Sequence, residues 1–591
     1  MARNKFDIDE DLESPFDIRH FRRAMVYIRK QKTPMLVAFL LSALSAGIGL
    51  SAPLIVQHVI DVTIPAKDKP ALLFWSAMTL ATIVVSVILA TIRSRIMTRV
   101  GQDIIFEIRS DLFKHLQQLP FQYYDDRPQG KILIRVVNYV NAVSDVLSNG
   151  IINFILEILN LVFIAIFMFA VDAKLSLVIL AGLPIFLLVM FLLKTRQRRA
   201  WQMVSNKSSN MNAYLQESIS GIRVTQIFTR EERNEGIFTR LAVNYRKAWM
   251  RAMYFTHLVP FSVDNLATLV LTAIFFVGLL VMGPAEATFG VILAMSAYAS
   301  RFWQPILNLS NIYNSFINSV AYLERIFETL DEPVTVSDVK DARELPPIKG
   351  SVTFDNVTFA YDPGLNILEN LNFHVKAGES IALVGPTGAG KTTVVNLISR
   401  FYNVTDGAIL VDGHDIAEVK LKSLRSQMGI MLQDSFIFSG TILDNIRYGK
   451  LDATEEEVIA AAKAVCADDF IREFEQGYLT EVNERGSKLS QGQRQLISFA
   501  RTLLADPRIL ILDEATSSID ARTERLLQKG LNELLKGRTS FIIAHRLSTV
   551  KNCDRILYVS DKGIAESGSH DELMAQRGRY YKLYTAQKME A

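Results

Sequence analysis

Long apolar runs alternate with charged stretches through the first half of this 591-residue chain. Residues 35–60 contain no acidic residue, lysine or arginine. At about 1.5 Å per residue, a helix of that length would cross a hydrocarbon layer of about 30 Å. Similar runs follow, and together they predict six membrane-spanning helices. The predicted spans are residues 35–60, 72–92, 151–171, 175–193, 261–282 and 289–312.

The joints between these spans alternate between short and long. Residues 61–71, 172–174 and 283–288 form short joints, whereas residues 93–150 and 194–260 form long joints that are rich in charge. Arginine and lysine gather at the start of both long joints. Because basic residues mark the cytosolic side of a membrane protein, we expect the long joints and both chain termini to be cytosolic.

Both long joints have the apolar spacing of helices. Residues 93–119 contain no proline, and Ile104, Ile108 and Phe113 recur with charged residues between them. Turn-forming residues gather at 121–130, and the chain then returns towards the membrane. The second long joint repeats this pattern. We therefore expect two helical fingers in the cytosol, and the C-terminal part of the chain is the partner available to their tips.

The sixth predicted span is the most polar, and its polar side chains recur every three or four residues on one helical face. They are Ser300, Gln304, Asn308, Asn311, Ser315 and Asn318. In lipid such a face must meet protein or water. It either lines a substrate cavity, with Gln304, Asn308 and Asn311 as candidate contacts, or forms hydrogen bonds between helices. Glu157 in the third span and Asp264 in the fifth pose the same question.

Changes in composition divide the chain into parts. Residues 1–17 are acidic and lack helical periodicity, which predicts a mobile leader. Residues 18–330 form a predicted transmembrane domain, which opens with a basic, amphipathic stretch typical either of a helix in the head-group layer or of an ordinary solvated helix. Residues 331–349 are a polar linker with prolines. In residues 350–591, β-branched strands alternate with helical stretches, which predicts an α/β fold with a largely parallel sheet.

Overall composition narrows the classes of partner. The 64 basic and 61 acidic residues leave a net charge of only +3, which gives no argument for nucleic-acid binding. Hydrophobic residues make up 50% of the chain, as expected for membrane spans beside a soluble core. The two cysteines, Cys466 and Cys553, lie in the C-terminal part and suit a reducing compartment.

The strongest chemical signal lies in the second domain. An apolar run at 381–384, a glycine-rich turn and a helix-compatible stretch at 394–398 supply the strand, loop and helix of a P-loop. The loop residues are Gly385, Pro386, Thr387, Gly388, Ala389, Gly390, Lys391, Thr392 and Thr393. The glycines let backbone N–H groups converge on phosphate, Lys391 adds positive charge and Thr392 can ligate Mg²⁺. We therefore predict that this domain binds a nucleoside triphosphate.

A second buried-strand run, residues 508–512, ends in Asp513 and Glu514. In P-loop ATPases a carboxylate at the end of the strand beside the P-loop is the second-shell ligand of Mg²⁺, and we assign Asp513 to this role. Glu514 is then placed to orient or deprotonate the attacking water. The alternative is that both carboxylates merely cap the following helix.

Together with Tyr361, Gln433, Asp520 and His545, these motifs resemble a bacterial ABC exporter half-transporter of the multidrug type. The resemblance extends from about residue 18 to the end. It implies that Tyr361 stacks on adenine, that Gln433 senses Mg²⁺ and contacts the finger tips, and that Asp520 lies in the D-loop. It also implies that Glu514 is the catalytic base and that His545 responds to the γ-phosphate.

The same resemblance implies a dimer. Ser490, Gly492 and Gln493 match the signature that completes the ATP site of the opposing subunit. The family signature usually reads Leu-Ser-Gly-Gly-Gln, and here Gln491 replaces the first glycine. In heterodimeric exporters an altered signature often accompanies an intact glutamate and histidine on the same chain. We therefore expect a heterodimer rather than a homodimer, although some homodimers also carry this variant.

The expected function is export of an amphipathic small molecule, a lipid or a peptide across the cell membrane, driven by ATP and Mg²⁺. A nucleotide-gated channel or membrane sensor is the alternative, and it predicts loss of Glu514 or His545. The chain retains both residues. An uptake transporter would keep its membrane spans on a separate subunit, whereas here the spans are fused to the nucleotide-binding domain.

Overall fold

The computed structural model describes residues 18–127, 129–283, 286–362, 364–431, 435–483, 486–514, 521–544 and 547–590, so the predicted leader lies outside the described residues. The chain forms two compact units. The helical unit comprises Met1–Leu116 and Gln129–Glu332, and the α/β unit comprises Gln117–Pro128 and Pro333–Ala591. The tip of the first finger therefore belongs to the same unit as the C-terminal domain.

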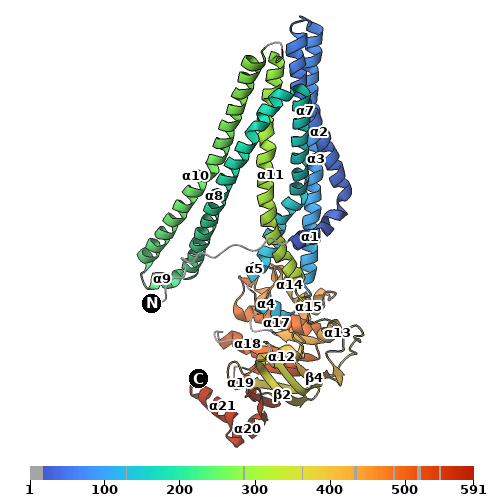
Figure 1. The fold of residues 1–591 in the computed structure, drawn as a ribbon. Coiled ribbons are helices and arrows are strands. Elements are labelled where there is room, and N and C mark those ends of the chain that lie inside the picture. The colour runs from blue at the N-terminus through green and yellow to red at the C-terminus, as the bar shows by residue number, and fades with distance from the viewer. Residues whose placement is uncertain are drawn as a thin grey trace. The chain divides into compact units, whose positions relative to one another are not determined.

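Long helices build the helical unit (Figure 1). In chain order its elements are α1 (Ile18–Lys30), α2 (Lys32–His58), the π-helical η1 (Val59–Thr63), α3 (Lys69–Leu116), α5 (Gln129–Ile134), η2 (Arg135–Tyr139), α6 (Val140–Asp145), η3 (Val146–Gly150), α7 (Ile151–Val171), α8 (Ala173–Ser220), α9 (Ile222–Ile227), α10 (Glu231–Phe276), η4 (Val277–Met282) and α11 (Phe289–Leu330).

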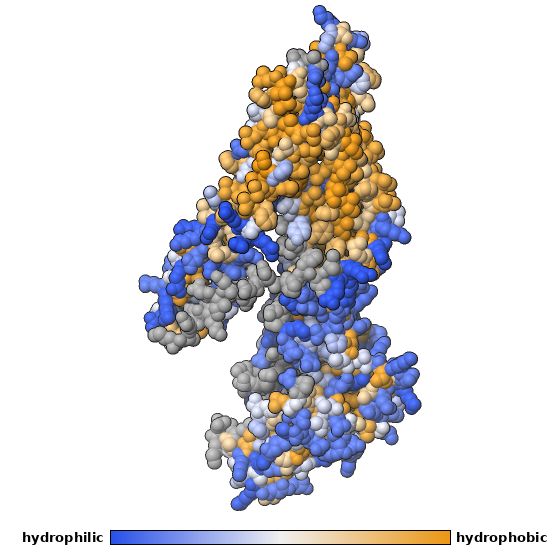
Figure 2. Space-filling model, viewed as in Figure 1, coloured by the Kyte–Doolittle hydropathy of each residue, from blue (hydrophilic) through white to orange (hydrophobic). Residues whose placement is uncertain are grey.

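Five helical segments among the described residues are long and apolar enough to cross a membrane. They are Lys32–Thr63, Lys69–Leu116, Ile132–Val171, Ala173–Ser220 and Glu231–Met282. The sixth predicted span lies in α11, which carries the polar stripe and packs against α2, α7 and α10 in the same bundle. Figure 2 shows a broad apolar band over these helices, between hydrophilic ends of the unit.

The short joints meet at one end of the bundle, as their alternation with the long joints predicts. The Asp61 carboxylate accepts hydrogen bonds from the Thr288 hydroxyl (2.5 Å) and the Gly290 N–H (2.8 Å), which ties the first joint to the start of α11. Lys174 in the second joint pairs with Glu286 in the third at 2.5 Å. Polar groups that would otherwise be left without partners therefore hold this end together.

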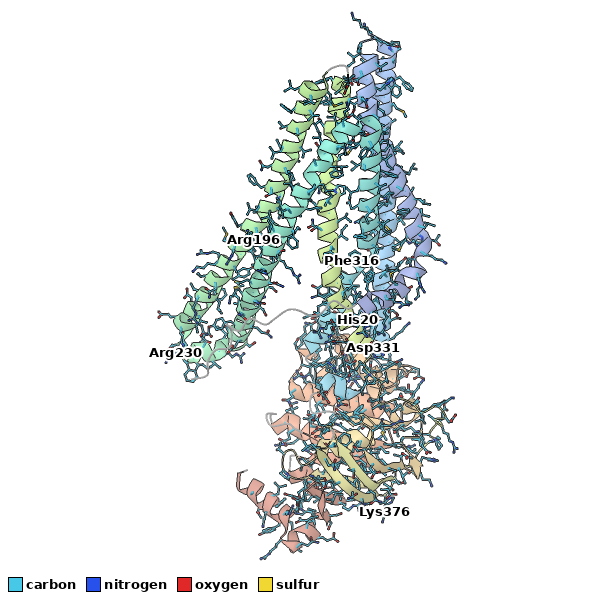
Figure 3. All side chains as sticks on the ribbon, in the orientation of Figure 1. His20, Arg196, Arg230, Phe316, Asp331 and Lys376 are labelled. Carbon is cyan, nitrogen blue, oxygen red and sulfur yellow. The ribbon has the colours of Figure 1, made fainter. Side chains whose placement is uncertain are left out.

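The long joints form the predicted fingers. Helix α3 runs without a break for 48 residues, or about 72 Å, because its interior contains no proline. Residues 121–130 were expected to form a turn, but α4 (Phe121–Asp125) adds one short helix there, after Pro120 as its N-cap. In the second finger α8 and α10 pack along each other, and α9 joins them. Arg230 marks this tip and Arg196 lies farther along α8 (Figure 3).

Helix α1 confirms the helical spacing predicted for residues 18–32. It packs against α3 and α11, with Ala24 and Ile28 buried. Arg23 forms a two-pronged hydrogen-bonded pair with Asp331 at the end of α11. His20, labelled near Asp331 in Figure 3, stacks on Phe327. The polar face of α1 is therefore partly used for packing on other helices.

The α/β unit contains α4 and the C-terminal elements. They are β1 (Val352–Ala360), β2 (Asn366–Val375), β3 (Ser380–Val384), α12 (Lys391–Ile398), β4 (Asp406–Val411), β5 (His414–Asp415), α13 (Leu421–Arg425), β6 (Met428–Met431), β7 (Gly440–Thr441), α14 (Ile442–Arg447), α15 (Glu455–Ala464), α16 (Asp468–Arg472), the 3₁₀ turn η5 (Gly477–Leu479), β8 (Glu481–Val482), α17 (Gln491–Ala505), β9 (Ile509–Glu514), α18 (Ala521–Leu535), β10 (Thr539–Ala544), α19 (Leu547–Lys551), β11 (Arg555–Ser560), β12 (Gly563–Gly568), α20 (His570–Gln576) and α21 (Arg579–Glu590).

The central sheet has the order β12-β11-β3-β10-β9-β6, and every neighbouring pair except β11–β12 is parallel. This confirms the predicted largely parallel α/β fold. A separate antiparallel sheet has the order β2-β1-β4-β5. Sequence alternation did not distinguish the two sheets, because the strand pattern gives no information about which strands pair.

Residues of the predicted linker lie against the α/β unit. The guanidinium of Arg400 donates to the Ser337 carbonyl at 3.0 Å, and the Asn403 side chain donates to the Thr335 carbonyl at 2.7 Å. Asp338 accepts a hydrogen bond from the Leu421 N–H at 2.7 Å. These bonds hold residues 335–338 against the α/β unit.

Candidate functional site

The P-loop joins β3 to α12 with a backbone that only glycine adopts easily. Gly385, Gly388 and Gly390 have φ values of +145°, +81° and +97°. A Cβ atom on Gly385 would lie 2.2 Å from the backbone oxygen of Val559 on β11. Helix α12 then begins at Lys391 with Gly390 as its N-cap. The loop residues Pro386, Thr387 and Ala389 complete the turn before α12, in which the Ala389 N–H donates to the Pro386 carbonyl at 3.2 Å. The N-terminus of α12 is its positive end.

The Lys391 side chain lies over this loop. Its ammonium group donates to the carbonyls of Gly385 and Pro386, each at 2.9 Å. Burial lowers the pKa of Lys391, and the nearby Asp513 carboxylate acts in the opposite direction. An ammonium group has three donors, so one remains for a phosphate oxygen. Thr392 in the same turn of α12 is exposed, whereas Thr393 is buried.

Asp513 and Glu514 end β9, as predicted, but β9 is not beside the P-loop strand. Strand β10 lies between them, and its Ile543 is level with both Leu383 on β3 and Asp513 on β9. The sequence did not predict this strand order, because a crossover in strand order leaves no trace in local sequence. Asp513 nevertheless lies near enough to Lys391 to influence its titration.

Three of the predicted site residues, Gln433, Asp520 and His545, lie outside the described residues. The backbone of Glu514 pairs with Ala544 at the end of β10.

Tyr361 lies next to the P-loop helix. Its hydroxyl shares a hydrogen bond with the Thr393 hydroxyl at 3.1 Å. Its ring packs edge-on against Phe359 and Tyr402, with centroid distances of 4.8 and 5.1 Å. The aromatic residue predicted to stack on adenine is therefore held beside α12 by both packing and a hydrogen bond.

The signature residues begin α17. Ser490 is its N-cap and forms a capping box with Gln493, whose N–H donates to the Ser490 hydroxyl while the Ser490 N–H donates to the Gln493 side chain. Gly492 is buried and Gln491 is exposed. The side chain that replaces the usual glycine thus points away from the core and leaves the helix start intact.

Helices α17 and α12 pack in different hydrophobic clusters of the α/β unit. Leu496 and Ile497 of α17 lie in one cluster with Ala382 and Val384 of β3, whereas Val394 and Leu397 of α12 lie in the other. That the signature serves the ATP site of another subunit stays a prediction.

The tip of the first finger contacts the segment that follows α12. Phe121 of α4 lies against Phe401 with ring centroids 4.5 Å apart, and the Tyr402 hydroxyl donates to the Asp125 carboxylate at 2.5 Å. Burial and this carboxylate raise the pKa of Tyr402. The predicted contact between a finger tip and the C-terminal domain is confirmed for this finger. Sequence reasoning missed Phe401 and Tyr402, although their position directly after the P-loop helix was a usable signal.

The polar stripe of α11 forms hydrogen bonds to other helices. Asn308 donates to Glu157 of α7 at 2.8 Å, and Lys194 of α8 donates to Asn311 at 3.1 Å. Within α11 itself, Gln304 donates to Asn308 at 3.3 Å. Gln304 and Asn311 are also exposed in the single chain. The stripe therefore connects helices and also presents polar groups at the bundle surface.

Comparisons with known proteins agree with this geometry. The profile of the ABC transporter transmembrane region matches residues 35–306, and that of the ABC transporter ATP-binding domain matches residues 368–517. The uncharacterized ABC transporter ATP-binding protein YknV of Bacillus subtilis is 41% identical over 99% of this chain and 98% of its own length. The chain belongs to the ABC exporters.

Two further relatives refine this assignment. A fatty acid ABC transporter ATP-binding/permease protein of Mycobacterium bovis is 38% identical over 86% of the exporter chain and 80% of its own length. A bacterial Atm1-family ABC exporter, solved with ATP bound, superposes with a TM-score of 0.78 at 29% identity, covering 97% of this chain and 99% of the other. The exporter is thus a multi-pass membrane protein that binds ATP and couples its hydrolysis to transport, and half-transporters of this kind work as dimers.

Proposed function

We propose that this exporter moves an amphipathic molecule out of the cytosol, with both termini and the α/β unit on the cytosolic side. The observation that carries the proposal is the contact of Phe121 and Asp125 with Phe401 and Tyr402. It lies within the α/β unit, between the tip of the first finger and the segment that directly follows the P-loop helix. A structural change at the nucleotide site can therefore reach the finger tip through this one contact.

In this proposal the P-loop backbone and Lys391 hold the phosphates of ATP, and Tyr361 packs on the adenine. Thr392 and Asp513, with Gln433, would hold Mg²⁺, since hydroxyl, carboxylate and amide oxygens are the ligands this ion prefers. When bound, the ion neutralises charge on the phosphates. Thr392 is exposed at the first turn of α12, and Asp513 lies within electrostatic range of Lys391, which fits such a site.

Glu514 and His545 would act on the γ-phosphate end of ATP. Glu514 would accept a proton from the attacking water, and His545 would donate a hydrogen bond to the γ-phosphate. Ser490, Gly492 and Gln493 at the start of α17 would cover the ATP that is bound to the opposing subunit. The N–H groups of Gln491 and Gly492, which the capping box does not use, suit this role at the start of the helix.

We further propose that the opposing subunit is a different half-transporter. Gln491 replaces a glycine where a backbone must approach phosphate, while Glu514 and His545 are retained. In such a heterodimer the two ATP sites would differ, and the site that contains this altered signature would be the one that contacts ATP less well. The exposed position of the Gln491 side chain leaves α17 undistorted, so the cost of the replacement would fall on the nucleotide contact.

The proposed substrate is amphipathic. Gln304, Asn308 and Asn311 would line its path, and they offer amide groups within an otherwise apolar bundle. A relative named as a fatty acid transporter supports an amphiphile as the class of substrate. The alternative of a nucleotide-gated channel is not favoured, because the catalytic glutamate and the histidine are both present.

The test is ATPase activity of this chain alone in lipid nanodiscs, with Glu514→Gln as the blank. The variant keeps the P-loop, so we expect ATP binding to persist while turnover falls by at least about a hundredfold. Wild-type-like turnover in the variant would contradict the role of Glu514. If the folded wild-type chain has low ATPase activity alone and a second half-transporter restores that activity, the result supports the heterodimer. Full ATPase activity of this chain without a partner would contradict the heterodimer.

A further inference from the structure

A cavity of about 240 Å³ lies among α2, α3 and α7 in the helical unit. Its polar lining consists of Ser42, Ser45, Arg93, Asn153, Glu157 and Asn160. Pockets that enclose whole drug-sized ligands are usually about 300–1,000 Å³. This cavity is smaller, and it places an arginine and a glutamate on its walls, which suits the polar head of a larger molecule.

Arg93 supplies hydrogen-bond donors to the cavity. Its Nε atom is buried and has no hydrogen-bond partner among the residues that the structure describes. Arg93 and Glu157 line the same space, yet no ion pair joins them within the described part of the chain. A buried guanidinium N–H without a partner is costly, so an oxyanion that binds there gains a charge-assisted hydrogen bond.

The other walls offer mainly acceptors. The Ser42 hydroxyl donates to the Ala38 carbonyl at 2.7 Å, and the Ser45 hydroxyl donates to the Ser86 carbonyl at 3.1 Å, so both serine oxygens have only lone pairs left to offer a ligand. The two oxygens of Glu157 can accept further hydrogen bonds.

The Glu157 carboxylate is held in place by amide groups. Asn308 of α11 donates to one oxygen at 2.8 Å, and Asn160 donates to the other at 3.5 Å. This fixes the negative charge on one wall while Arg93 carries positive charge on another. Neither an anion alone nor a cation alone satisfies both walls.

The cavity also lies near one end of the apolar stretch of α3. Arg93 follows directly after the apolar residues 72–92, and Glu157 lies six residues, or about 9 Å, from the start of α7 at Ile151. Arg93 therefore marks one end of the apolar stretch, and Glu157 lies a short way inside it. A molecule with its head in this cavity has its apolar part among the spans.

We propose that this cavity binds the head group of a zwitterionic amphiphile. The oxyanion, a phosphate or carboxylate, lies on Arg93, and the ammonium group lies between Glu157 and the two serines. This deepens the proposed function, on which it rests, by naming the chemical class of the amphiphile. Asn308 then has a second role, since it positions the carboxylate that receives the ammonium group.

The experiment measures equilibrium binding of labelled lysophosphatidylethanolamine to the full-length exporter in phosphatidylglycerol nanodiscs without nucleotide. Arg93→Gln and Glu157→Gln should each weaken binding by about tenfold or more, since each removes one charge-assisted contact. Arg95→Gln, on the exposed side of the same helix, is the matched control and should leave binding unchanged. Binding that survives both cavity variants would overturn the proposal.

Two competing ligands test whether the cavity needs both charges of the head group and whether the ligand needs an acyl chain. Lysophosphatidylglycerol, which has only the oxyanion, should compete about tenfold less well and should be insensitive to Glu157→Gln. Equal competition by the anion would overturn the zwitterion assignment. Equal competition by glycerophosphoethanolamine, which has no acyl chain, would overturn the assignment to an amphiphile.

A second measurement uses the unmodified chain and does not depend on the folding of any variant. A lysophosphatidylethanolamine with a diazirine in its head group should label peptides from α2, α3 or α7 after irradiation. Labelling confined to other helices would overturn the proposal. Because nucleotide is absent from both measurements, failure here is distinct from failure of the ATPase assay with Glu514→Gln.

Discussion

Replacing Phe121 by alanine tests whether the first finger transmits the state of the nucleotide site. Phe121 is the aromatic residue of α4 that lies 4.5 Å, centroid to centroid, from Phe401. The Arg425 guanidinium lies over the other ring of this pair, 5.2 Å from the Phe401 centroid. Removal of the Phe121 ring therefore takes one partner from a small cluster of two tilted rings and a guanidinium group and leaves the P-loop unchanged.

The size of the effect follows from the burial of the ring. Phe121 is 43% exposed, so it gains roughly half of the about 1.5–3 kcal/mol expected for a fully buried side chain. The aromatic contact adds about 0.5–1.5 kcal/mol. Together these give about 2 kcal/mol, which shifts the docking equilibrium of the finger tip by roughly 30-fold.

The assay compares basal with substrate-stimulated ATPase activity in nanodiscs. We expect Phe121→Ala to retain basal activity within about twofold while stimulation by transported compounds is largely lost. Phe106→Ala removes a ring that is 73% exposed on the same finger and serves as the control. Normal stimulation in a folded Phe121→Ala protein would refute the role of this contact.

Other predictions concern the P-loop and helix α1. Lys391→Ala should weaken ATP binding by about tenfold or more, measured by titration with a fluorescent ATP analogue, because it removes a charge-assisted phosphate contact. Gly385→Ala should abolish ATP binding in the same titration and lower the Tm, because the alanine Cβ would lie 2.2 Å from the Val559 oxygen. A normal Tm for this variant would contradict the prediction. Arg23 lowers the pKa of Asp331, so this pair should stabilise the protein above about pH 4 and lose that effect as pH falls through the lowered pKa. Because both side chains are about half exposed, Arg23→Gln should lower the free energy of unfolding by at most about 1 kcal/mol at pH 7, measured by thermal unfolding. An equal decrease at pH 3 would contradict this dependence on the ionisation of Asp331.

The local features of this protein were predictable from the sequence. Apolar length and period gave the membrane helices, and the glycine spacing with Lys391 gave the P-loop, because both depend on residues that are neighbours in the chain. Ser490 as the start of α17 was predictable for the same reason. The polar stripe of α11 was also visible, but its hydrogen bonds to Glu157 and Lys194 were not, since their partners lie on other helices.

The tertiary structure decided how these features meet. The sequence placed Asp513 at the end of a strand, but only the sheet order shows that β10 separates that strand from β3. The sequence predicted that a finger tip needs a partner, whereas the contact with Phe401 and Tyr402 emerges only when segments about 280 residues apart are folded together. Local propensity determines helices, strands and turns, because each depends on nearby residues. Strand order, crossovers and cavities depend on packing between residues that are far apart in the sequence, and this packing is determined only when the whole chain folds.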